Sequence, residues 1–490
     1  MSSQTKTPSL VIFSAEPNNG RTESLVLSCI DPRFAYATEQ YLYDKYTSNG
    51  LSYDHFVLAG SAMGGLLIAT GATFGNGTCS VLSANSNWHQ TLKDHIQIAI
   101  TLHNIKKVEI LDHLNCGAYG TCLLGAPVGA TGDQGVTYHM GQYTGLANRL
   151  SGTTFFSHDN LQGNTSGNVI FSSGITGGYF DGYATSPTTT LIDYGGNSIL
   201  TELKGRNSGA KVLVLGCIDP RYSSVLSSFL REFKDVQFVY DLFVLAGASI
   251  GANQSYLTNG NIRTQGTTGS YANNILSDGR AGIGELGRQW GPAFFDHLSL
   301  ARSLHQISEV WVFDHLDCGA YKAIHYGDLG NPDSSVYPHI TEMTKLKTII
   351  DGYTTRTGII VDPLNTTAYS LGFKGYIIDQ DGSIGRYVDG NTVLGGVVGL
   401  TGQTGLGSPN MLIRDSSDYT RSLKQGRLFR DFTGTRSNAG SSSAQNTPYS
   451  RPVDFSIAQS NQNRLTYNFG GIVCGCTGAF PTLPLGATGR

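Results

Sequence analysis

Residues 24–35, SLVLSCIDPRFA, and residues 211–223, KVLVLGCIDPRYS, are two versions of one stretch. Each begins with an apolar run that predicts a buried strand and ends in Cys-Ile-Asp-Pro-Arg. Two more pairs follow in the same order: YDHFVLAGSAMGGL at 53–66 with YDLFVLAGASIGAN at 240–253, and VEILDHLNCGAYG at 108–120 with VWVFDHLDCGAYK at 310–322. The chain is therefore a tandem duplication, and both halves are expected to share one fold.

Each copy alternates segments typical of strands with segments typical of helices. This alternation predicts an α/β fold in which a mostly parallel sheet is flanked by helices. The 63 glycines indicate long, tightly turned loop insertions. Because 490 residues exceed what one hydrophobic core usually supports, we predict a first repeat over 1–200, a second repeat over 201–390 and a Gly/Ser-rich C-terminal extension over 391–490.

The composition argues against several classes of partner. The net charge is −3 and there is no basic run, so we expect neither nucleic acid nor an anionic membrane as a partner. The sequence contains no apolar run of about 18 residues and no signal-peptide pattern at its start. We expect a soluble intracellular or organellar protein. Eight cysteines are too few for a disulfide scaffold in a chain of this length.

The cysteines and histidines of the repeated motifs have the pattern of a metal site. One Cys follows a predicted strand and a His-x-x-Cys follows another, and an α/β sheet presents its ligands at such strand ends. Two thiolates and one imidazole suit zinc, and three protein ligands leave a fourth position for water. The predicted ligands of one zinc ion per repeat are Cys29, His113 and Cys116 in the first repeat and Cys217, His315 and Cys318 in the second.

An Asp and an Arg accompany the first cysteine of each set. These are Asp31 with Arg33, and Asp219 with Arg221. A charge-assisted pair of this kind can hold the carboxylate in place. The carboxylate could then orient a water or hydroxide on the zinc, or it could fill the fourth position itself and close the site. The residues alone leave both arrangements open.

Cys-x-Asp-x-Arg followed by His-x-x-Cys-Gly resembles the β-class carbonic anhydrases, a family that includes carbonyl sulfide and carbon disulfide hydrolases. The resemblance implies that the Cys and His residues bind zinc, that Asp and Arg form a catalytic dyad, and that two units pair, here as an intrachain pseudo-dimer. It implies a lyase that hydrates CO₂ reversibly to bicarbonate, with zinc lowering the pKa of its bound water to about 7. Carbon disulfide or carbonyl sulfide is the alternative substrate.

The chain departs from the family pattern at several positions. Many members have a Gln nine residues before the first Cys, where Gly20 and Ser208 stand here. The strand that usually reads Arg-Asn-Ala reads Leu-Ala-Gly at 58–60 and 245–247. A frequent pocket Tyr is replaced by Ile98 or Leu300. We therefore expect an altered pocket wall.

Other residues near the motifs have two interpretations. Phe56 and Phe243 could form the apolar wall of the pocket, although an aromatic residue in a strand is typical of the core. Four histidines near the third motif could transfer protons, but we expect them on helix surfaces and assign them no role. They are His89, His103, His297 and His305.

A second hypothesis is a structural protein that builds a shell, lattice or filament on a zinc-stabilised fold of the same type. The 14% charged fraction and the Gly-rich insertions favour it, because such loops can contact neighbouring subunits. Both complete Asp–Arg pairs favour the enzyme, because a structural zinc site does not need them. We expect a homo-oligomer under either hypothesis, and a larger assembly through the Gly-rich loops under the second.

Overall fold

The protein is described by a computed structural model. It describes residues 22–49, 51–68, 73–74, 77–78, 87–124, 135–153, 155–156, 168–169, 174–181, 188–204, 210–232, 240–254, 289–326, 333–356, 371–378, 384–393, 409–412 and 429–435. The chain divides into two compact units, one of residues 18–374 and one of residues 1–17 with 375–490. The first unit contains both sets of predicted ligands. The domain boundaries expected from the sequence stay predictions.

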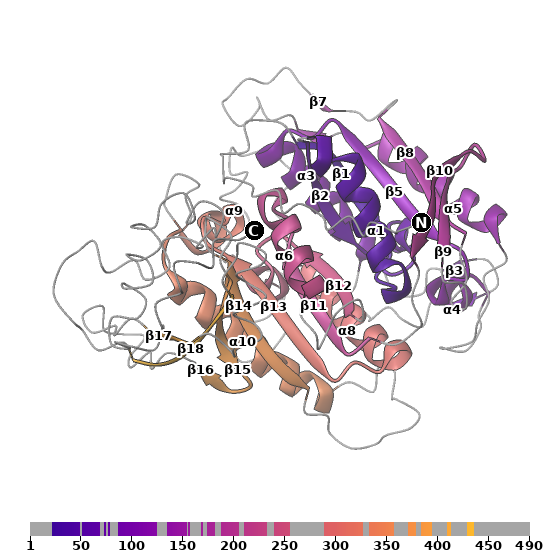
Figure 1. Cartoon of the computed structure of the whole chain (residues 1–490). Coiled ribbons are helices and arrows are strands. Elements are labelled where there is room, and N and C mark those ends of the chain that lie inside the picture. The colour runs from indigo at the N-terminus through magenta and orange to yellow at the C-terminus, as the bar shows by residue number, and fades with distance from the viewer. Residues whose placement is uncertain are drawn as a thin grey trace, which may run out of the picture. The chain divides into compact units, whose positions relative to one another are not determined.

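The first repeat forms a six-stranded sheet of order β10-β9-β8-β5-β1-β2 (Figure 1). Four neighbouring strands are parallel: β1 (Thr22–Ser28), β2 (Ser52–Val57), β5 (Lys107–His113) and β8 (Ile175–Phe180). Two antiparallel strands extend this sheet: β9 (Thr188–Asp193) and β10 (Ser198–Lys204). The chain leaves β1 on one side for β2 and returns on the other for β5. The carboxyl ends of β1 and β5 therefore meet where the strand order reverses, which is where such sheets bind ligands.

The second repeat has the same central order, β12-β11-β13-β14. These strands are β11 (Val212–Cys217), β12 (Tyr240–Leu245), β13 (Glu309–His315) and β14 (Gly372–Ile378). Residues 372–374 of β14 belong to the first unit. β11 pairs in parallel with both β12 and β13. The predicted fold class is confirmed as mixed α/β, with two sheets of mostly parallel strands flanked by helices.

The helices of the two repeats correspond in order. The first repeat has α1 (Pro32–Lys45), α2 (Ser61–Gly64), α3 (Trp88–His103), α4 (Gly117–Leu124) and α5 (Val136–Ser151), with a 3₁₀ turn at Thr47–Asn49. The second has α6 (Pro220–Glu232), α7 (Ser249–Ala252), α8 (Trp290–His305), α9 (Gly319–Tyr321), a π-helical turn at Lys322–Tyr326, and α10 (Val336–Arg356). The short strands β3 (Thr73–Phe74), β4 (Gly77–Thr78), β6 (Phe155–Phe156) and β7 (Asn168–Val169) form two small antiparallel pairs.

The repeated Cys-Ile-Asp-Pro-Arg motif is a helix start. Asp31 is the N-cap of α1, and its carboxylate accepts a hydrogen bond from the backbone N–H of Arg33 at 3.0 Å. Pro32 stands in the first turn, where its missing N–H costs nothing. Asp219 accepts the same bond from the backbone of Arg221 at 3.0 Å. The motif thus ends a buried strand and begins a helix within four residues.

The two repeats pack against each other within the first unit. α3 contacts α8, and the edge strand β2 contacts β12. Each of two fully buried indoles donates a hydrogen bond to a buried carboxylate of the other repeat: Trp88 to Asp296 and Trp290 to Asp94, both at 2.9 Å. The same contact is therefore made in both directions across the interface.

The second unit contains the end of β14 and four further described strands. These are β15 (Ile384–Asp389), β16 (Thr392–Val393), β17 (Pro409–Leu412) and β18 (Phe429–Thr435). β15 pairs antiparallel with β16 and parallel with β18, which pairs antiparallel with β17. Most of the predicted C-terminal extension lies outside the described residues.

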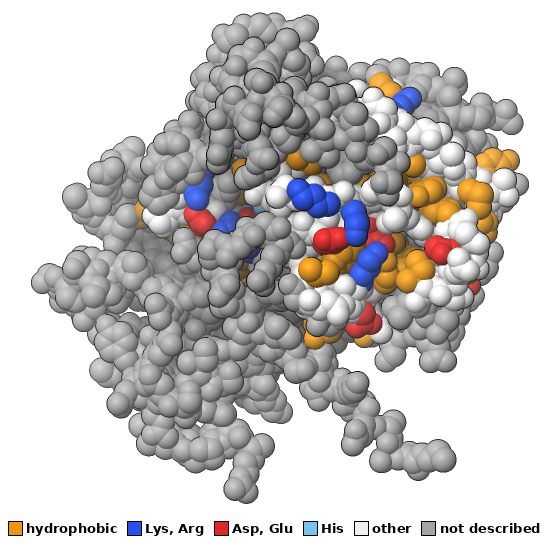
Figure 2. Space-filling view, turned by 90° about the horizontal axis from the view of Figure 1, so that it is seen from above, with side chains coloured by type: hydrophobic (Ala, Val, Ile, Leu, Met, Phe, Trp, Pro, Cys, Tyr) orange, Lys and Arg blue, Asp and Glu red, His pale blue; other side chains and the backbone are white. Residues whose placement is uncertain are grey.

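Two observations concern the described surface and helices. On the face drawn in Figure 2, described Lys and Arg side chains lie beside Asp and Glu side chains, with no continuous basic area among them. None of the described helices combines the length and the apolar composition that a membrane crossing requires.

Candidate metal centres

The structure brings together the six predicted metal ligands in two groups. The ligand atoms of Cys29, His113 and Cys116 all lie within 4.8 Å of one another, and the same holds for the second set, Cys217, His315 and Cys318. The two sulfur atoms are 3.9 Å apart in the first group and 4.0 Å apart in the second. Each group could hold a metal ion. We refer to them as centre 1 and centre 2.

The ligand histidines each present a bare nitrogen to their centre. His113 donates from Nδ1 to the carbonyl oxygen of Leu114 at 3.0 Å, and His315 donates to that of Leu316 at 2.9 Å. In the neutral form of each ring, this bond leaves the lone pair on Nε2. Both Nε2 atoms are buried and have no hydrogen-bond partner among the described residues. A buried acceptor without a partner is costly, and a metal ion beside two thiols would satisfy it.

Two local backbone features place the cysteines. The residues before Cys116 and Cys318, Asn115 and Asp317, have left-handed backbones with φ of 60° and 59°. Asn and Asp tolerate this conformation better than most residues, which allows the tight loop between His and Cys. The sequence interpretation did not use this middle position of the His-x-x-Cys motif.

Gly60 and Gly247, the glycines of the Leu-Ala-Gly segments, contact the other ligand cysteine. Their N–H groups donate to Sγ of Cys29 and Cys217, each at 3.2 Å. Their φ values are +72° and +73°, and an added Cβ would lie 2.7 Å from Met63 and 2.5 Å from Ile250. Only glycine fits these turns. The segment expected to form an altered pocket wall thus also supplies a hydrogen bond to a ligand.

The paired thiols of each centre share one proton unequally. Burial alone would raise the pKa of Cys29, but the hydrogen bond from Cys116 and the charge of His113 outweigh it and hold the pKa well below its usual value. The pKa of Cys116 is raised well above its usual value by the hydrogen bond to Cys29 and by burial. Cys217 and Cys318 show the same opposite shifts. One sulfur per centre is therefore disposed to be a thiolate, the form that binds metals.

Asp31 is held beside centre 1 by Arg33. The guanidinium donates from Nε to Oδ1 at 2.9 Å and from a terminal nitrogen to Oδ2 at 2.5 Å. Oδ2 lies 3.6 Å from Nε2 of His113. Burial would raise the pKa of Asp31, but the charge of His113 and the bonds from Arg33 hold it well below its usual value. The carboxylate is not a member of the three-ligand group.

Asp219 has the same arrangement at centre 2, with one addition. Arg221 donates to both oxygens of Asp219, at 2.9 Å and 2.6 Å. It also donates to Oδ2 of Asp317 at 2.8 Å, and Asp317 is paired with Lys322. The corresponding Asn115 offers Arg33 only its backbone oxygen, at 2.9 Å. Arg221 is therefore shared by two carboxylates, whereas Arg33 holds one.

In each repeat a buried Asp precedes the ligand histidine, and its hydrogen bonds restrain the strand that carries this histidine. At centre 1, Asp112 accepts hydrogen bonds from the backbone of Ala62 at 3.3 Å and from the hydroxyls of Tyr119 and Tyr194 at 3.0 and 2.8 Å. It precedes His113 in β5. These bonds restrain the backbone that carries the ligand.

At centre 2 the support includes a charged histidine. Asp314 accepts from Nδ1 of His339 at 3.3 Å, and Asp333 lies 3.2 Å from Nε2 of the same ring. Burial lowers the pKa of His339, but its bonds to the two carboxylates raise it to about 9. Asp333 also accepts from the backbone N–H of Cys318 at 3.0 Å. The ligand loop is thus tied to a buried ionic cluster.

Each repeat places a His–Asp pair near the centre of the other repeat. His305 donates from Nδ1 to Asp241 at 2.9 Å. Burial lowers the pKa of His305, but the charge of Asp241 and this bond raise it to about 9, and the charges of Asp31 and Cys29 add to the shift. The residue before it, Leu304, lies close to Gly117, which follows a centre 1 ligand. The end of α8 in the second repeat therefore lies near centre 1.

The reciprocal pair is His103 with Asp54, whose Nδ1 and Oδ1 atoms are 2.8 Å apart. Burial lowers the pKa of His103, but Asp54 raises it, and so does Asp219 of centre 2. Leu102 lies close to Gly319, the residue after a centre 2 ligand.

The expectation that four histidines lie on helix surfaces was wrong. His297 is fully buried, His89 and His103 are 8% and 9% exposed, and the side chain of His305 is 13% exposed. The cause is that α3 and α8 pack against each other, so one repeat covers the helix face that the other would expose. Phe56 and Phe243 are fully buried, and their rings pack against those of His95 and His297. Ile98 and Leu300 are also buried, whereas Gly20 and Ser208 lie outside the described residues.

Comparison with known proteins adds little to this geometry. No protein-family model matches the chain, and no solved structure matches it. An uncharacterised protein of Rickettsia bellii (strain RML369-C) is 29% identical over 96 residues, which make up 20% of this chain and 48% of the relative. The chain spans about half the length of this relative, whose name assigns it no function.

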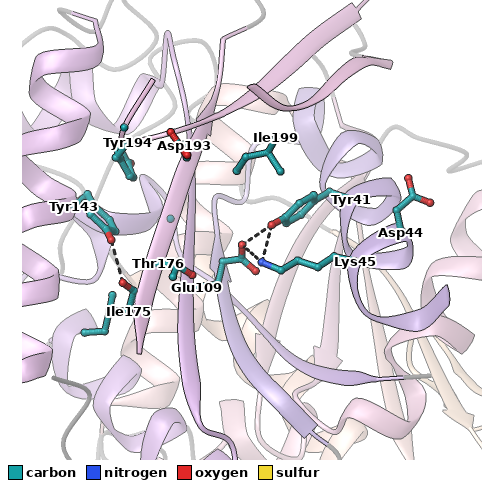
Figure 3. A pocket seen from close by; sticks show the side chains of 12 residues that line it. Tyr41, Asp44, Lys45, Glu109, Tyr143, Ile175, Thr176, Asp193, Tyr194 and Ile199 are labelled. Carbon is teal, nitrogen blue, oxygen red and sulfur yellow. Dashed lines mark hydrogen bonds and ion pairs between the residues drawn. The ribbon is translucent and has the colours of Figure 1, made fainter. Parts of the chain in front are cut away.

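A separate cavity of about 650 Å³ lies in the first repeat (Figure 3). Glu109, in the same strand as His113, accepts hydrogen bonds there from Tyr41 at 2.5 Å and Lys45 at 2.6 Å. No metal ligand lines this cavity. The corresponding residue of the second repeat is Trp311, which lies under Lys374 at 4.6 Å from its ammonium. The sequence interpretation missed this cluster because a single Glu in a strand forms no motif.

Proposed function

We propose that this chain is a zinc enzyme with two centres that hydrates CO₂ reversibly to bicarbonate, built as two tandem β-class carbonic anhydrase-like domains that form an intrachain pseudo-dimer. One observation carries the proposal: a Cys-His-Cys group lies beside an Asp whose two carboxylate oxygens are both held by an Arg, and this arrangement occurs twice.

The donor set supports zinc and an open position. Two sulfurs and one imidazole nitrogen are ligands that zinc prefers, and a structural zinc site would normally have a fourth protein ligand. Nε2 of His113 and Nε2 of His315 are buried without a hydrogen-bond partner among the described residues, so each is available as the imidazole ligand. A bound zinc ion would supply a Lewis acid that lowers the pKa of a coordinated water molecule.

Asp31 and Asp219 would orient the reacting water. Each carboxylate is held ionised by its Arg, so it can accept a hydrogen bond but not donate one. It therefore selects one orientation of the water and leaves a lone pair directed at the carbon of CO₂. Arg33 and Arg221 keep the carboxylate in that position, which reduces the cost of ordering the reactants.

Contacts across the repeats support the pseudo-dimer. Each of the two repeats contributes a His–Asp pair near the centre of the other. Each centre takes its ligands and its dyad from one repeat and a neighbouring His–Asp pair from the other.

The test measures zinc per chain together with the CO₂ hydration rate at pH 7 and pH 8.5. The intact chain, Cys29→Ser and Cys217→Ser are compared, with Cys474→Ser, a cysteine that is not one of the six predicted ligands, as the matched control. We expect two zinc ions in the intact chain and the control, one in each centre variant, and a rate that falls with the loss of zinc. Two zinc ions without hydration at either pH would contradict the proposal.

Two further measurements separate the alternatives. Release of hydrogen sulfide from carbon disulfide or carbonyl sulfide, faster than hydration of CO₂, would assign the other substrate class. A zinc-loaded particle in the megadalton range without hydration would support the assembly hypothesis instead.

A further inference from the structure

The turn that donates a hydrogen bond to Cys29 is held by the other repeat. Gly60 donates to the Cys29 sulfur at 3.2 Å, and the N–H of the preceding residue, Ala59, donates to Nε2 of His297 at 2.8 Å. His297 belongs to α8 of the second repeat. A side chain of one repeat thus fixes the backbone that contacts a ligand of the other.

The arrangement is repeated in the opposite direction. Gly247 donates to the Cys217 sulfur at 3.2 Å, and Ala246 donates to Nε2 of His95 at 2.8 Å. His95 belongs to α3 of the first repeat. Because the same two bonds occur in both directions with matching lengths, they are a feature of the duplicated design and not of one site.

Both histidines are set as acceptors. His297 donates from Nδ1 to the carbonyl oxygen of Ala293, and His95 donates to that of Thr91, both at 2.7 Å. Each ring is fully buried, and burial lowers both pKa values to about 3. The neutral tautomer with a lone pair on Nε2 is therefore present at any ordinary pH.

Aromatic rings of both repeats hold the two imidazoles in position. His297 packs between Trp88 and Phe243, with ring centroids 4.2 and 4.4 Å away. His95 packs between Trp290 and Phe56, at 4.6 and 4.4 Å. The indoles are those that hydrogen-bond to carboxylates across the interface. The rings therefore have little freedom, and a small shift of the interface would move them.

The hydrogen bond to the sulfur matters for metal binding. An N–H donor stabilises the thiolate, which is the form that binds metals. Residues that hold a ligand from behind typically contribute about 10–100-fold to metal affinity. The turn is closely packed, because an atom at the Cβ position of Gly60 would lie 2.7 Å from the side chain of Met63.

We propose that His297 and His95 are positioning residues that act across the repeats, each holding the Ala-Gly turn that hydrogen-bonds the first cysteine ligand of the other repeat. The metal affinity of each centre then depends on a side chain from the opposite half of the chain. The proposal rests on metal binding by these cysteines, which is part of the proposed function, and not on CO₂ hydration.

The test uses the full chain with one centre removed at a time. Cys217→Ser leaves centre 1 and Cys29→Ser leaves centre 2. Cobalt(II) alone is the probe, because its thiolate charge-transfer absorption reports both affinity and sulfur bonding without any need for activity. In each background the variants His297→Leu, His297→Gln, His95→Leu and His95→Gln are titrated.

We expect His297→Leu to weaken cobalt binding at centre 1 by about 10–100-fold and to shift its charge-transfer band, with centre 2 changed less than about twofold. His95→Leu should do the reverse. Gln carries an acceptor oxygen at a similar reach, so His297→Gln and His95→Gln should recover most of the lost affinity. Urea unfolding of each metal-free variant measures any general loss of stability.

An equal loss at both centres, a loss only at the centre of the same repeat, or an unchanged affinity would overturn the proposal. If the Leu variants do not fold, His297→Ala and His95→Ala replace them: a loss at the opposite centre alone supports the proposal, and an equal loss at both centres or no loss overturns it. Cobalt binding without CO₂ hydration by the zinc-loaded parent would overturn the proposed function while leaving this test valid.

Discussion

Centres 1 and 2 share their ligand geometry and differ in the charges around it. The sulfur pairs are 3.9 and 4.0 Å apart, and each carboxylate of the dyad lies 3.6 or 3.7 Å from the ligand histidine. Around this constant frame, Asn115 is replaced by Asp317, and Ala62 by Ser249, whose hydroxyl adds a bond of 2.6 Å to Asp314. Ligand geometry is therefore conserved between the repeats while the neighbouring charges are not.

The reason is that the ligands depend on backbone features present in both repeats. A strand end, an Asp–Pro helix start, a left-handed residue before the second Cys and a left-handed glycine place the donor atoms. The charged neighbours act through space and can change without moving these elements. The comparison predicts that the dyads have equal importance and that the differences around them have smaller effects.

The largest effect should come from removing the arginines. In chains with a single centre, Arg33→Ala and Arg221→Ala should each lower kcat/KM for CO₂ hydration by about 100-fold or more, because the carboxylate loses the group that holds it. The measurement is stopped-flow hydration at saturating zinc. Lys in place of Arg should recover only part of the rate, since it lacks the planar fork. A loss at one centre and none at the other would break the equivalence of the two centres.

An intermediate effect is expected for the buried ionic cluster of centre 2. The pKa of His339 is about 9 in the folded protein against an ordinary value of 6.5. Because this pKa is raised, the interaction of protonated His339 with Asp314 and Asp333 stabilises the folded chain fully below about pH 6.5. This stabilisation is lost as the pH rises through about 9. His339→Asn should therefore destabilise the chain by up to about 3 kcal/mol at pH 6, and by much less at pH 9.5. Urea unfolding at both pH values measures this.

His139→Asn is the matched control in the first repeat. Its ring lies 3.7 Å from Asp112, and Asp133 precedes it by as many residues as Asp333 precedes His339, although Asp133 lies outside the described residues. The same pH-dependent loss in His139→Asn would show that both repeats have the cluster. A loss independent of pH in His339→Asn would contradict the ionic explanation.

The smallest effect should come from exchanging the neutral and charged neighbours of the arginines. Asp317→Asn gives centre 2 the residue of centre 1, and Asn115→Asp does the reverse. The side chain of Asp317 is 28% exposed, so its bond to Arg221 is expected to contribute only about 0.5 kcal/mol. Each exchange should change hydration less than about threefold. A tenfold change would show that the second carboxylate tunes the dyad directly.

Much of the fold and of both centres could be predicted because the signals are local and occur twice. The apolar runs indicate strands, the alternation with helices indicates parallel sheets, and each ligand stands at a strand end. The supporting residues could not be predicted in this way. Asp112 and Asp314 precede the ligand histidines in strands that otherwise read as ordinary core. Their partners include Ala62, 50 residues from Asp112, and His339, 25 residues from Asp314.

The sequence by itself determined the duplication and predicted which residues gather in the two Cys-His-Cys groups and the two Asp–Arg pairs, because helix starts and strand ends are encoded by neighbouring residues. Only the tertiary structure decided that His297 and His95 support the centre of the opposite repeat. Their bonds join residues 238 and 151 positions apart, so no local pattern can indicate them. His297, which we expected on a helix surface, is a buried acceptor because the two repeats pack on each other, and that packing is a property of the whole fold.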